Sequence, residues 1–529
     1  MSENNKSWSL PLIISISVTA GMILGYYYYR NTNTVSAEVS GKIPAVLNYI
    51  DKFYVDTVSV ARLTEEAIPE ILKNLDPHSV YMPAEDAERE NEPLEGGFSG
   101  IGVQFNMMND TVIIITPVAN GPSARLGIRP GDRIVKVNGQ IVAGVKMKSD
   151  SVVKRLKGPR GTKVKVSILR PGVANLLDYT ITRDNIPLYS VDIAYMVNPT
   201  IGFIKLNQFG RTSFNEFVEA ISKLRSQGMK KLILDLRSNG GGYMDVAIQL
   251  ADQFLEENKL IVYTQGRSKK KDEIAYSTAQ GICEKEDIAV LIDEYSASAS
   301  EILAGAIQDN DRGIIIGRRS FGKGLVQRPI TLNDGSMIRI TIARYYTPTG
   351  RCIQKPYDKG EEEYMLDLVH RYEKGEFASK DSIHLNDSLK FVTPKGKVVY
   401  GGGGIMPDIF VPMSKEGMTP FYLKVRNNGL IYNFAFDYVD RNRSKLEGLK
   451  DAASISDYLE KQNIYKEFLA YLSKKSINAD KKESVKSKHI LNTELKAYIA
   501  RNLIDNQGFY PIIQDIDATL IKAIDTLSK

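Results

Sequence analysis

Three serines and one lysine stand in a pattern that could support nucleophilic chemistry. Ser296, Ser298 and Ser300 lie between an apolar run at 289–292 and apolar residues at helical spacing, which predicts a strand, a sharp turn and a helix. The start of a helix carries exposed N–H groups and the positive end of the helix dipole, which favour developing negative charge. A serine in this turn is therefore placed to act as a nucleophile, and the glycine-flanked Lys323 further along the chain could supply the base.

Both motifs also have an interpretation without chemistry. Ser298 is followed three residues later by Glu301, which fits a capping box that only begins the helix. A lysine between glycines, as in Gly322-Lys323-Gly324, is usually a solvated loop residue.

The histidines favour a lysine base. The chain has four of them, and none lies near the serine turn in the sequence: His78, His370, His384 and His489. A Ser-His-Asp triad is an awkward fit, although triads are assembled in space. A Ser-Lys pair is simpler, and it requires that the pKa of Lys323 fall through burial against apolar neighbours such as Leu325 and Val326.

These segments carry a family resemblance. Residues 296–306, SASASEILAGA, and 320–327, SFGKGLVQ, closely resemble the carboxyl-terminal processing (tail-specific) proteases, which are PDZ-bearing Ser-Lys peptidases. The resemblance implies that Ser298 is the nucleophile, Lys323 the general base and Gln327 the residue that orients the lysine. It alone selects Ser298 from the three serines.

One acidic residue also matches the family. Asp309 stands at an acidic position implicated in some members, so the resemblance implies a supporting role. The alternative is a plain surface aspartate at the end of a helix.

A glycine-rich loop is the next chemical motif. An apolar run at 231–236 predicts a buried strand that leads into Arg237-Ser-Asn-Gly-Gly-Gly242, where unobstructed N–H groups could bind an oxyanion. The loop could equally cradle a phosphate, but it lacks the spacing and the Lys-Ser/Thr of a P-loop. The resemblance covers this segment too, and it implies an oxyanion hole made by the amide of Gly241 or Gly242 with that of Ala299.

Residues 95–170 show short strands, a short helix and an Asn-Gly turn, an order that resembles a PDZ domain. Such domains add a peptide's C-terminal segment to a sheet edge and hold its carboxylate on backbone N–H groups. The matching positions for that cradle are Ser99, Gly100, Ile101 and Gly102. The alternative is that these glycines only turn the chain.

The N-terminal segment predicts membrane contact through residues 9–29. Residues 10–29 are nearly uncharged and long enough to cross a bilayer, and Tyr26–Tyr29 suit an interfacial aromatic belt. A cleaved signal peptide is the alternative, with Val35-Ser36-Ala37 as its small-residue site. We favour the anchor, and the resemblance suggests the bacterial inner membrane with the catalytic part facing the periplasm.

Composition argues against several other classes of protein and of site. A chain of 529 residues with 43% hydrophobic content exceeds one compact core. The net charge of +6 is small and not gathered into one run, which argues against nucleic-acid binding. Two cysteines, Cys283 and Cys352, make neither a disulfide framework nor a metal cluster, so we expect no metal and no cofactor.

The sequence therefore predicts a multidomain α+β protein. Its expected parts are a membrane anchor or signal segment at 1–30, a helical region at 36–85, a PDZ domain at 86–175, an α/β Ser-Lys protease core at 185–412 with a polar insertion at about 355–395, and a helical C-terminal domain at 413–529. In the last part, apolar spacing predicts three amphipathic helices, within 455–472, 491–498 and 512–527.

The expected function is that of a serine endopeptidase that cleaves protein substrates at or near accessible C-terminal tails captured by the PDZ domain. A membrane-tethered PDZ scaffold with an inactive protease fold is the alternative, and a Ser-Lys hydrolase of non-peptide acyl groups is a third possibility. Self-assembly and an adaptor protein are both open as further partners. The helical pair in 42–75 should pack against the protease body or a second copy.

Overall fold

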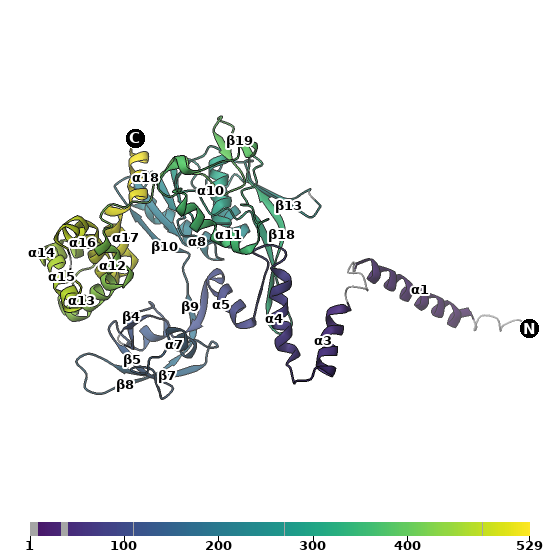
Figure 1. Ribbon diagram of the computed structural model, residues 1–529, viewed down its shortest axis with the longest axis horizontal. Helices are drawn as coiled ribbons and strands as arrows, with labels where there is room; N and C mark the ends of the chain where they lie inside the picture. Colours follow the sequence, from purple (N-terminus) through teal and green to yellow (C-terminus); the bar gives the residue numbers. More distant parts are fainter. Residues whose placement is uncertain (1–8, 33–40, 109, 269, 479) are drawn as a thin grey trace, which may run out of the picture. The chain divides into compact units, whose positions relative to one another are not determined.

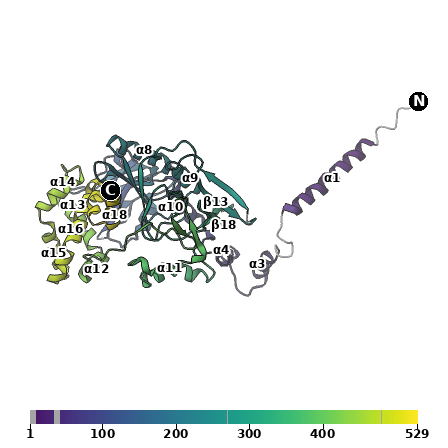
Figure 2. The same ribbon diagram turned by 90° about the horizontal axis from the view of Figure 1, so that it is seen from above.

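The computed structural model describes residues 9–32, 41–108, 110–268, 270–478 and 480–529, which form two compact units, Met1–Leu75 and Asp76–Lys529 (Figures 1 and 2). The described residues of the first unit include the helices α1 (Ser9–Thr32), α3 (Lys42–Phe53) and α4 (Val60–Leu72). The expected helical pair is present, and Pro69 lies inside α4.

In the described part of the chain, none of the helices combines the length and the apolar character needed to span a bilayer. The side chains of Tyr26–Tyr29 and the small-residue site at 35–37 lie outside the described residues.

The second unit begins with β1 (Val80–Met82) and α5 (Ala84–Glu95) and continues into a sheet of the order β3-β4-β5-β7-β8, in which β6 pairs with β5. Its strands are β3 (Val103–Met108), β4 (Thr111–Pro117), β5 (Arg133–Val137), β6 (Gln140–Ile141), β7 (Lys163–Leu169) and β8 (Leu177–Thr182). Two helices, α6 (Pro122–Arg125) and α7 (Ser149–Leu156), and a separate ribbon of β2 (Gly97–Gly100) with β9 (Asp184–Pro187) complete this region. Strand β3 forms one edge of the sheet.

The central sheet has the order β10-β11-β12-β15-β16-β21. Its strands are β10 (Val191–Met196), β11 (Ile201–Leu206), β12 (Lys231–Asp235), β15 (Asp287–Ile292), β16 (Ile314–Gly317) and β21 (Ile409–Phe410). Only β10 runs antiparallel to its neighbour, and the other pairs are parallel. The strands are apolar on both faces, as is usual for a parallel sheet covered on each side.

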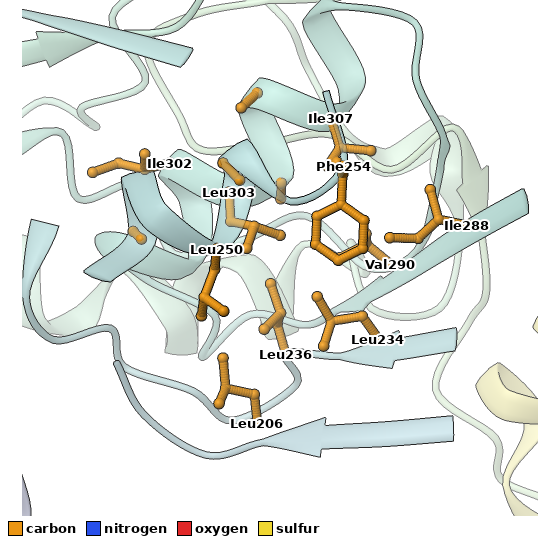
Figure 3. Packing of buried hydrophobic residues seen from close by; sticks show 14 of the residues in the cluster. Leu206, Leu234, Leu236, Leu250, Phe254, Ile288, Val290, Ile302, Leu303 and Ile307 are labelled. Atoms are coloured by element: carbon orange, nitrogen blue, oxygen red, sulfur yellow. The ribbon is translucent and has the colours of Figure 1, made fainter. Parts of the chain in front are cut away.

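Side chains that alternate along these strands enter two different cores. On one face, Leu234 and Val290 pack with helices α8 (Ser213–Ser226), α9 (Met244–Asp252) and α10 (Ala299–Asp309), as Figure 3 shows for part of this core. On the other face, the neighbouring residues pack against α18 (Ala518–Ser528). The sheet is thus covered by elements far apart in the sequence.

A second sheet follows the order β1-β18-β13-β14, and β17 also pairs with β18. Its further strands are β13 (Leu260–Gly266), β14 (Lys271–Tyr276), β17 (Leu325–Thr331) and β18 (Met337–Tyr346). Because β17 starts two residues after Lys323, this sheet fixes the lysine segment.

The polar insertion is more than a surface hairpin. It contains α11 (Glu361–Glu373), two short 3-10 turns at Lys380–Ser382 and Asp387–Leu389, and the pair β19 (Lys390–Val392) and β20 (Val398–Tyr400). Tyr364 and Arg371 of α11 are buried, and Arg371 donates hydrogen bonds to the carbonyls of Arg319 and Ser320. The insertion therefore packs against the segment that leads to Lys323.

The C-terminal region is helical, as expected, but has more helices than the sequence predicts. They are α12 (Pro420–Asn427), α13 (Leu430–Leu446), α14 (Ala452–Lys461), α15 (Ile464–Lys474), α16 (Lys481–Ile504), α17 (Asn506–Ile513) and α18, with a 3-10 turn at Gln514–Ile516. The stretch 455–472 is divided because Asn463 adopts a left-handed conformation, with φ 51°. Helix α18 packs on the central sheet rather than in the helical core of α12–α17.

Candidate active site

Ser298 lies in the sharp turn between β15 and α10 and forms the N-cap of α10. Its backbone has φ 56° and ψ −114°, a conformation that residues other than glycine rarely adopt. Holding it there costs on the order of 1–3 kcal/mol, which the surrounding structure must supply. Strain of this kind is typical of a residue whose position is set by function.

The predicted capping box is also present. The N–H of Ser298 donates to Glu301 Oε2 at 2.9 Å. The interpretation of Ser298 and Glu301 as a helix cap is therefore confirmed. However, a cap alone does not require the fully buried environment that Glu301 has.

Glu301 connects the serine turn with the lysine loop. Its carboxylate also accepts the N–H groups of Gly322 and Lys323, each at 2.8 Å, and the hydroxyl of Ser320. Burial raises the pKa of this carboxyl, and the four donors oppose that effect. The sequence interpretation missed this role, although a single acid in the run SASASEILAGA was the available signal.

Tyr345 is a second buried link between the same segments. Its hydroxyl lies 2.7 Å from the carbonyl oxygen of Lys323 and 3.1 Å from that of Ser298, so one proton is shared between two acceptors. The backbones at Ser298 and Lys323 are thus fixed to each other by two buried side chains.

Lys323 has the properties required of a base. Burial and the nearby Arg339 guanidinium lower its pKa to about 8, even though Glu301 and Asp76 act in the opposite direction. Its Nζ donates to Gln327 Oε1 at 3.0 Å, as the family resemblance implies for these two residues. The interpretation as a solvated loop lysine does not fit these surroundings.

Gln327 is itself held by a distant part of the chain. Its Nε2 donates to the carbonyl oxygen of His78, and the His78 N–H donates to Asp76 Oδ1 at 2.9 Å. The imidazole Nε2 lies 2.7 Å from the Tyr364 hydroxyl, and burial, with the charge of Lys323, lowers the pKa of His78 to about 4. A histidine remote in sequence therefore reaches the site, but through its backbone carbonyl.

The glycine loop approaches the serine turn closely. A Cβ on Gly241 would lie 2.8 Å from Ser298 Cβ and 2.9 Å from Ala299 N, and its φ is +104°, so only glycine fits here. The Gly241 N–H already donates to Asn239 Oδ1 at 2.9 Å. Of the two predicted glycine amides, that of Gly242 is therefore the better oxyanion donor. Its partner Ala299 is the first residue of α10, whose N–H has no acceptor within the helix.

A cavity of about 700 Å³ brings these groups together. Ser298, Ala299, Lys323, Gln327 and the glycine triplet all line it. Its apolar lining includes Met244, Ile302, Leu325, Val326 and Met337. The arrangement places a serine hydroxyl, a lysine of lowered pKa and backbone N–H donors around one space.

Asp309 lies at the other end of α10 and is not among the residues that line the cavity. It pairs with Arg351 at 2.7 Å, with both side chains fully buried, and accepts hydrogen bonds from the N–H and hydroxyl of Thr349. Asp309 is therefore no plain surface residue, and any effect on catalysis would act through this buried pair.

The predicted carboxylate cradle lies partly in β2 and partly in the link between β2 and β3. Ser99 and Gly100 belong to β2 and pair with Asn185 and Asp184 of β9. Ile101 is buried in the core, and its carbonyl oxygen accepts from the N–H and hydroxyl of Ser123.

Gly102 turns the chain with φ +70° into β3, the edge strand. The Ser99 hydroxyl is buried, and we find no protein partner for it among the described residues.

Comparisons with known proteins match two parts of this chain to known families. Peptidase family S41 matches residues 200–360, and the PDZ domain matches residues 91–169. A carboxy-terminal-processing protease from Bartonella bacilliformis is 40% identical over 306 residues, which are 57% of this chain and 69% of the relative. This chain belongs to the carboxy-terminal-processing protease family. It is a serine peptidase with a PDZ domain.

Other relatives share the family. A probable CtpA-like serine protease from Staphylococcus saprophyticus is 32% identical over 349 residues, 65% of this chain and 70% of that protein. Among solved structures, the photosystem II D1 C-terminal processing protease is 28% identical with a TM-score of 0.33, and the match covers 58% of this chain and 87% of that one. The PDZ domain of the carboxy-terminal protease from Vibrio cholerae, solved in complex with a peptide, is 38% identical with a TM-score of 0.16, covering 17% and 99%.

The C-terminal helices of this carboxy-terminal-processing protease match a different family. Residues 421–505 correspond to a family of unknown function, DUF8443. None of the three matched ranges includes α18.

Proposed function

We propose that this protease cleaves protein substrates at or near their C-termini with a catalytic pair, Ser298 and Lys323, after its PDZ domain has captured the substrate's tail. The proposal is carried by the lowered pKa of Lys323 and by its place in the cavity that Ser298 also lines. A lysine pKa of about 8 leaves a useful neutral fraction near pH 7.

The mechanism follows from the groups around the cavity. Neutral Lys323, oriented by Gln327, removes the hydroxyl proton as Ser298 attacks the peptide carbonyl. The amides of Gly242 and Ala299 stabilise the tetrahedral oxyanion, a contribution worth roughly a hundred- to thousandfold in rate for each donor. Lys323 then passes the proton to the leaving amine, and water resolves the acyl-enzyme.

Tail capture uses the free edge of β3. An extended peptide adds to such an edge through main-chain hydrogen bonds, while its carboxylate binds backbone N–H groups at the start of the strand. The chain from Ser99 to Gly102 leads directly into β3, which supports these residues as the carboxylate cradle.

The test is cleavage of a protein with an unfolded C-terminal tail by the full chain, compared with Ser298→Ala and Lys323→Ala. We expect the parent to cut and both variants to bind the tail without cutting. Activity in Lys323→Ala would exclude the Ser-Lys pair. If none of the three cuts while all bind, the scaffold interpretation is favoured instead.

We also propose that residues 9–29 attach the chain to the bacterial inner membrane with the protease in the periplasm. The nearly uncharged sequence at 10–29 supports this. The full chain should remain with membranes after a high-salt or carbonate wash, whereas residues 31–529 should be released. Release of both would refute membrane attachment.

A further inference from the structure

The glycine loop beside Ser298 is supported by a helix that comes much later in the chain. This loop, residues 238–242, directly follows Arg237, which lies two residues after the end of β12. Three glycines give a loop no stiffness of its own, so its shape depends on what holds its neighbours. The contacts of Arg237 show which element does so.

Arg237 joins β12 to the first residue before α18. Its NH1 and NH2 donate to the two carboxylate oxygens of Asp517, at 2.8 and 2.7 Å. Its Nε and NH2 also donate to Asp235, at 2.9 and 2.7 Å. Paired contacts of this kind fix the plane of the guanidinium as well as its position.

Two carboxylates, Asp235 and Asp517, and two cations, Arg237 and Lys205, balance the charge in this cluster. Burial opposes ionisation of Asp235, but Arg237 and Lys205 lower its pKa to about 2. Lys205 Nζ also donates to the Arg237 carbonyl oxygen at 2.9 Å, which holds the backbone where the loop begins. Without Asp517, one of the two carboxylates that hold Arg237 would be lost.

Hydrogen bonds link this loop, and through it Arg237, to the serine turn. The carbonyl oxygen of Asn239 accepts from Ala297 N at 3.0 Å and from the Ser300 hydroxyl at 2.9 Å, and the Asn239 side chain accepts the Gly241 N–H. Both partners of the Asn239 carbonyl lie within two residues of Ser298. The backbone that follows Arg237 is therefore continuous with the oxyanion site.

Helix α18 is itself fixed firmly. Asp517 caps it by accepting from Thr519 N and Leu520 N, at 3.1 and 3.0 Å. Leu520, Ala523 and Leu527 are buried against the central sheet. Near its other end, the Leu527 carbonyl accepts from Lys231 Nζ at 2.5 Å. Helix α18 thus contacts the residues at both ends of β12.

We propose that Asp517 is a positioning residue for this reaction: through Arg237 it sets the conformation of the 238–242 loop and thereby the oxyanion donors. The inference rests on the proposed function of Ser298 and Lys323. It assigns a role in catalysis to α18, which lies outside the matched family ranges.

The test replaces Asp517 by Asn in the full chain. Asparagine is as good an N-cap as aspartate, so α18 keeps its cap while Arg237 loses the charged, two-pronged partner. We expect kcat for a peptide substrate to fall about tenfold or more with KM nearly unchanged, since an oxyanion donor is worth more than that. Asp517→Glu, which keeps the charge, should recover part of the loss.

The matched control is Asp451→Asn. Asp451 caps α14 within the helical region by accepting Ser454 N at 2.8 Å, so the same substitution removes a charge from a cap remote from the loop. Its kcat should equal that of the parent. The concentration of active sites in each sample is measured by titration, so that a change in folded fraction is not read as a change in rate.

A second readout separates positioning from stability. Affinity for a peptide aldehyde, whose adduct with Ser298 needs the oxyanion donors, should fall in Asp517→Asn in parallel with kcat. Affinity for an uncleaved peptide should not. Unchanged kcat per active site, or a loss matched by equal loss of peptide affinity, would overturn the inference. If Ser298→Ala or Lys323→Ala still cuts, the proposed function fails, and that result is distinct from full activity in Asp517→Asn.

Discussion

The two ends of helix α10 each bury an acidic residue, but the two residues are satisfied in different ways. At the first turn, Glu301 accepts hydrogen bonds from three backbone N–H groups and one hydroxyl, none of which carries a charge. At the last turn, Asp309 pairs with the Arg351 guanidinium. A carboxylate paired with a cation fixes a fold, whereas one held by neutral backbone donors fixes the loops that carry those donors.

We expect the largest effect on stability from removing the Asp309 carboxylate. Asp309→Ala leaves Arg351 buried without its partner, and breaking such a pair typically costs about 3–5 kcal/mol of unfolding free energy. We expect a large drop in the denaturant midpoint, with kcat per folded molecule close to that of the parent. The measurement is chemical denaturation beside active-site titration. A variant of normal stability and low kcat would place Asp309 in the chemistry instead.

Glu301→Gln should show the opposite pattern. Glutamine keeps one acceptor oxygen, but its NH2 group can only donate, so some of the N–H groups now bound to Glu301 lose their acceptor. Misplacement of catalytic groups by about 1 Å can cost about a hundredfold in rate, and we expect kcat to fall by that order. Unfolding and kinetics are measured on the same preparation. Parental kcat in a folded variant would contradict the positioning role.

Replacing each of the two acidic residues should also affect the pH dependence of the rate differently. In the proposed mechanism only neutral Lys323 accepts the serine proton, so kcat/KM of the parent should rise with pH and level off above about 8. Glu301 raises the pKa of Lys323, so the residual activity of Glu301→Gln should level off at lower pH. Asp309→Asn should leave the inflection where it is. An unshifted Glu301→Gln profile would mean that Glu301 carries no charge in the enzyme.

The smallest expected effect concerns Arg339. Its charge lowers the pKa of Lys323, so Arg339→Met should move the inflection of kcat/KM to higher pH, by less than one pH unit. The difference in inflection between the parent and Arg339→Met should shrink at high salt, because salt screens the Arg339 charge in the parent. A shift to lower pH would contradict the assignment of the inflection to Lys323.

The sequence predicts the local parts of this site well. The strand, turn and helix around Ser298, the strand before the glycine loop and the order of elements in the PDZ domain all follow from short-range periodicity and turn residues. Each is determined by residues close together in the chain, which is what sequence patterns report.

The rest depends on contacts between distant segments. The carbonyl of His78 that holds Gln327, the Arg339 charge near Lys323 and the Asn239 side chain that occupies the Gly241 amide leave no periodic signal. The insertion at 355–395 is polar in sequence, yet Tyr364 and Arg371 are buried against other segments. A single sequence shows residue types, but it does not show which of them meet.

The position of α18 in the chain has a consequence for biosynthesis. A nascent chain contains Ser298 and Lys323 long before Asp517, and at a synthesis rate of about 5–20 residues per second the interval is on the order of ten to forty seconds. During that time the sheet face formed by Ile233, Ala289 and Leu291 lacks its covering helix. Arg237 gains its second carboxylate partner only after α18 has docked. If Asp517 positions the glycine loop as proposed, a growing enzyme would be slow to digest its own unfinished tail.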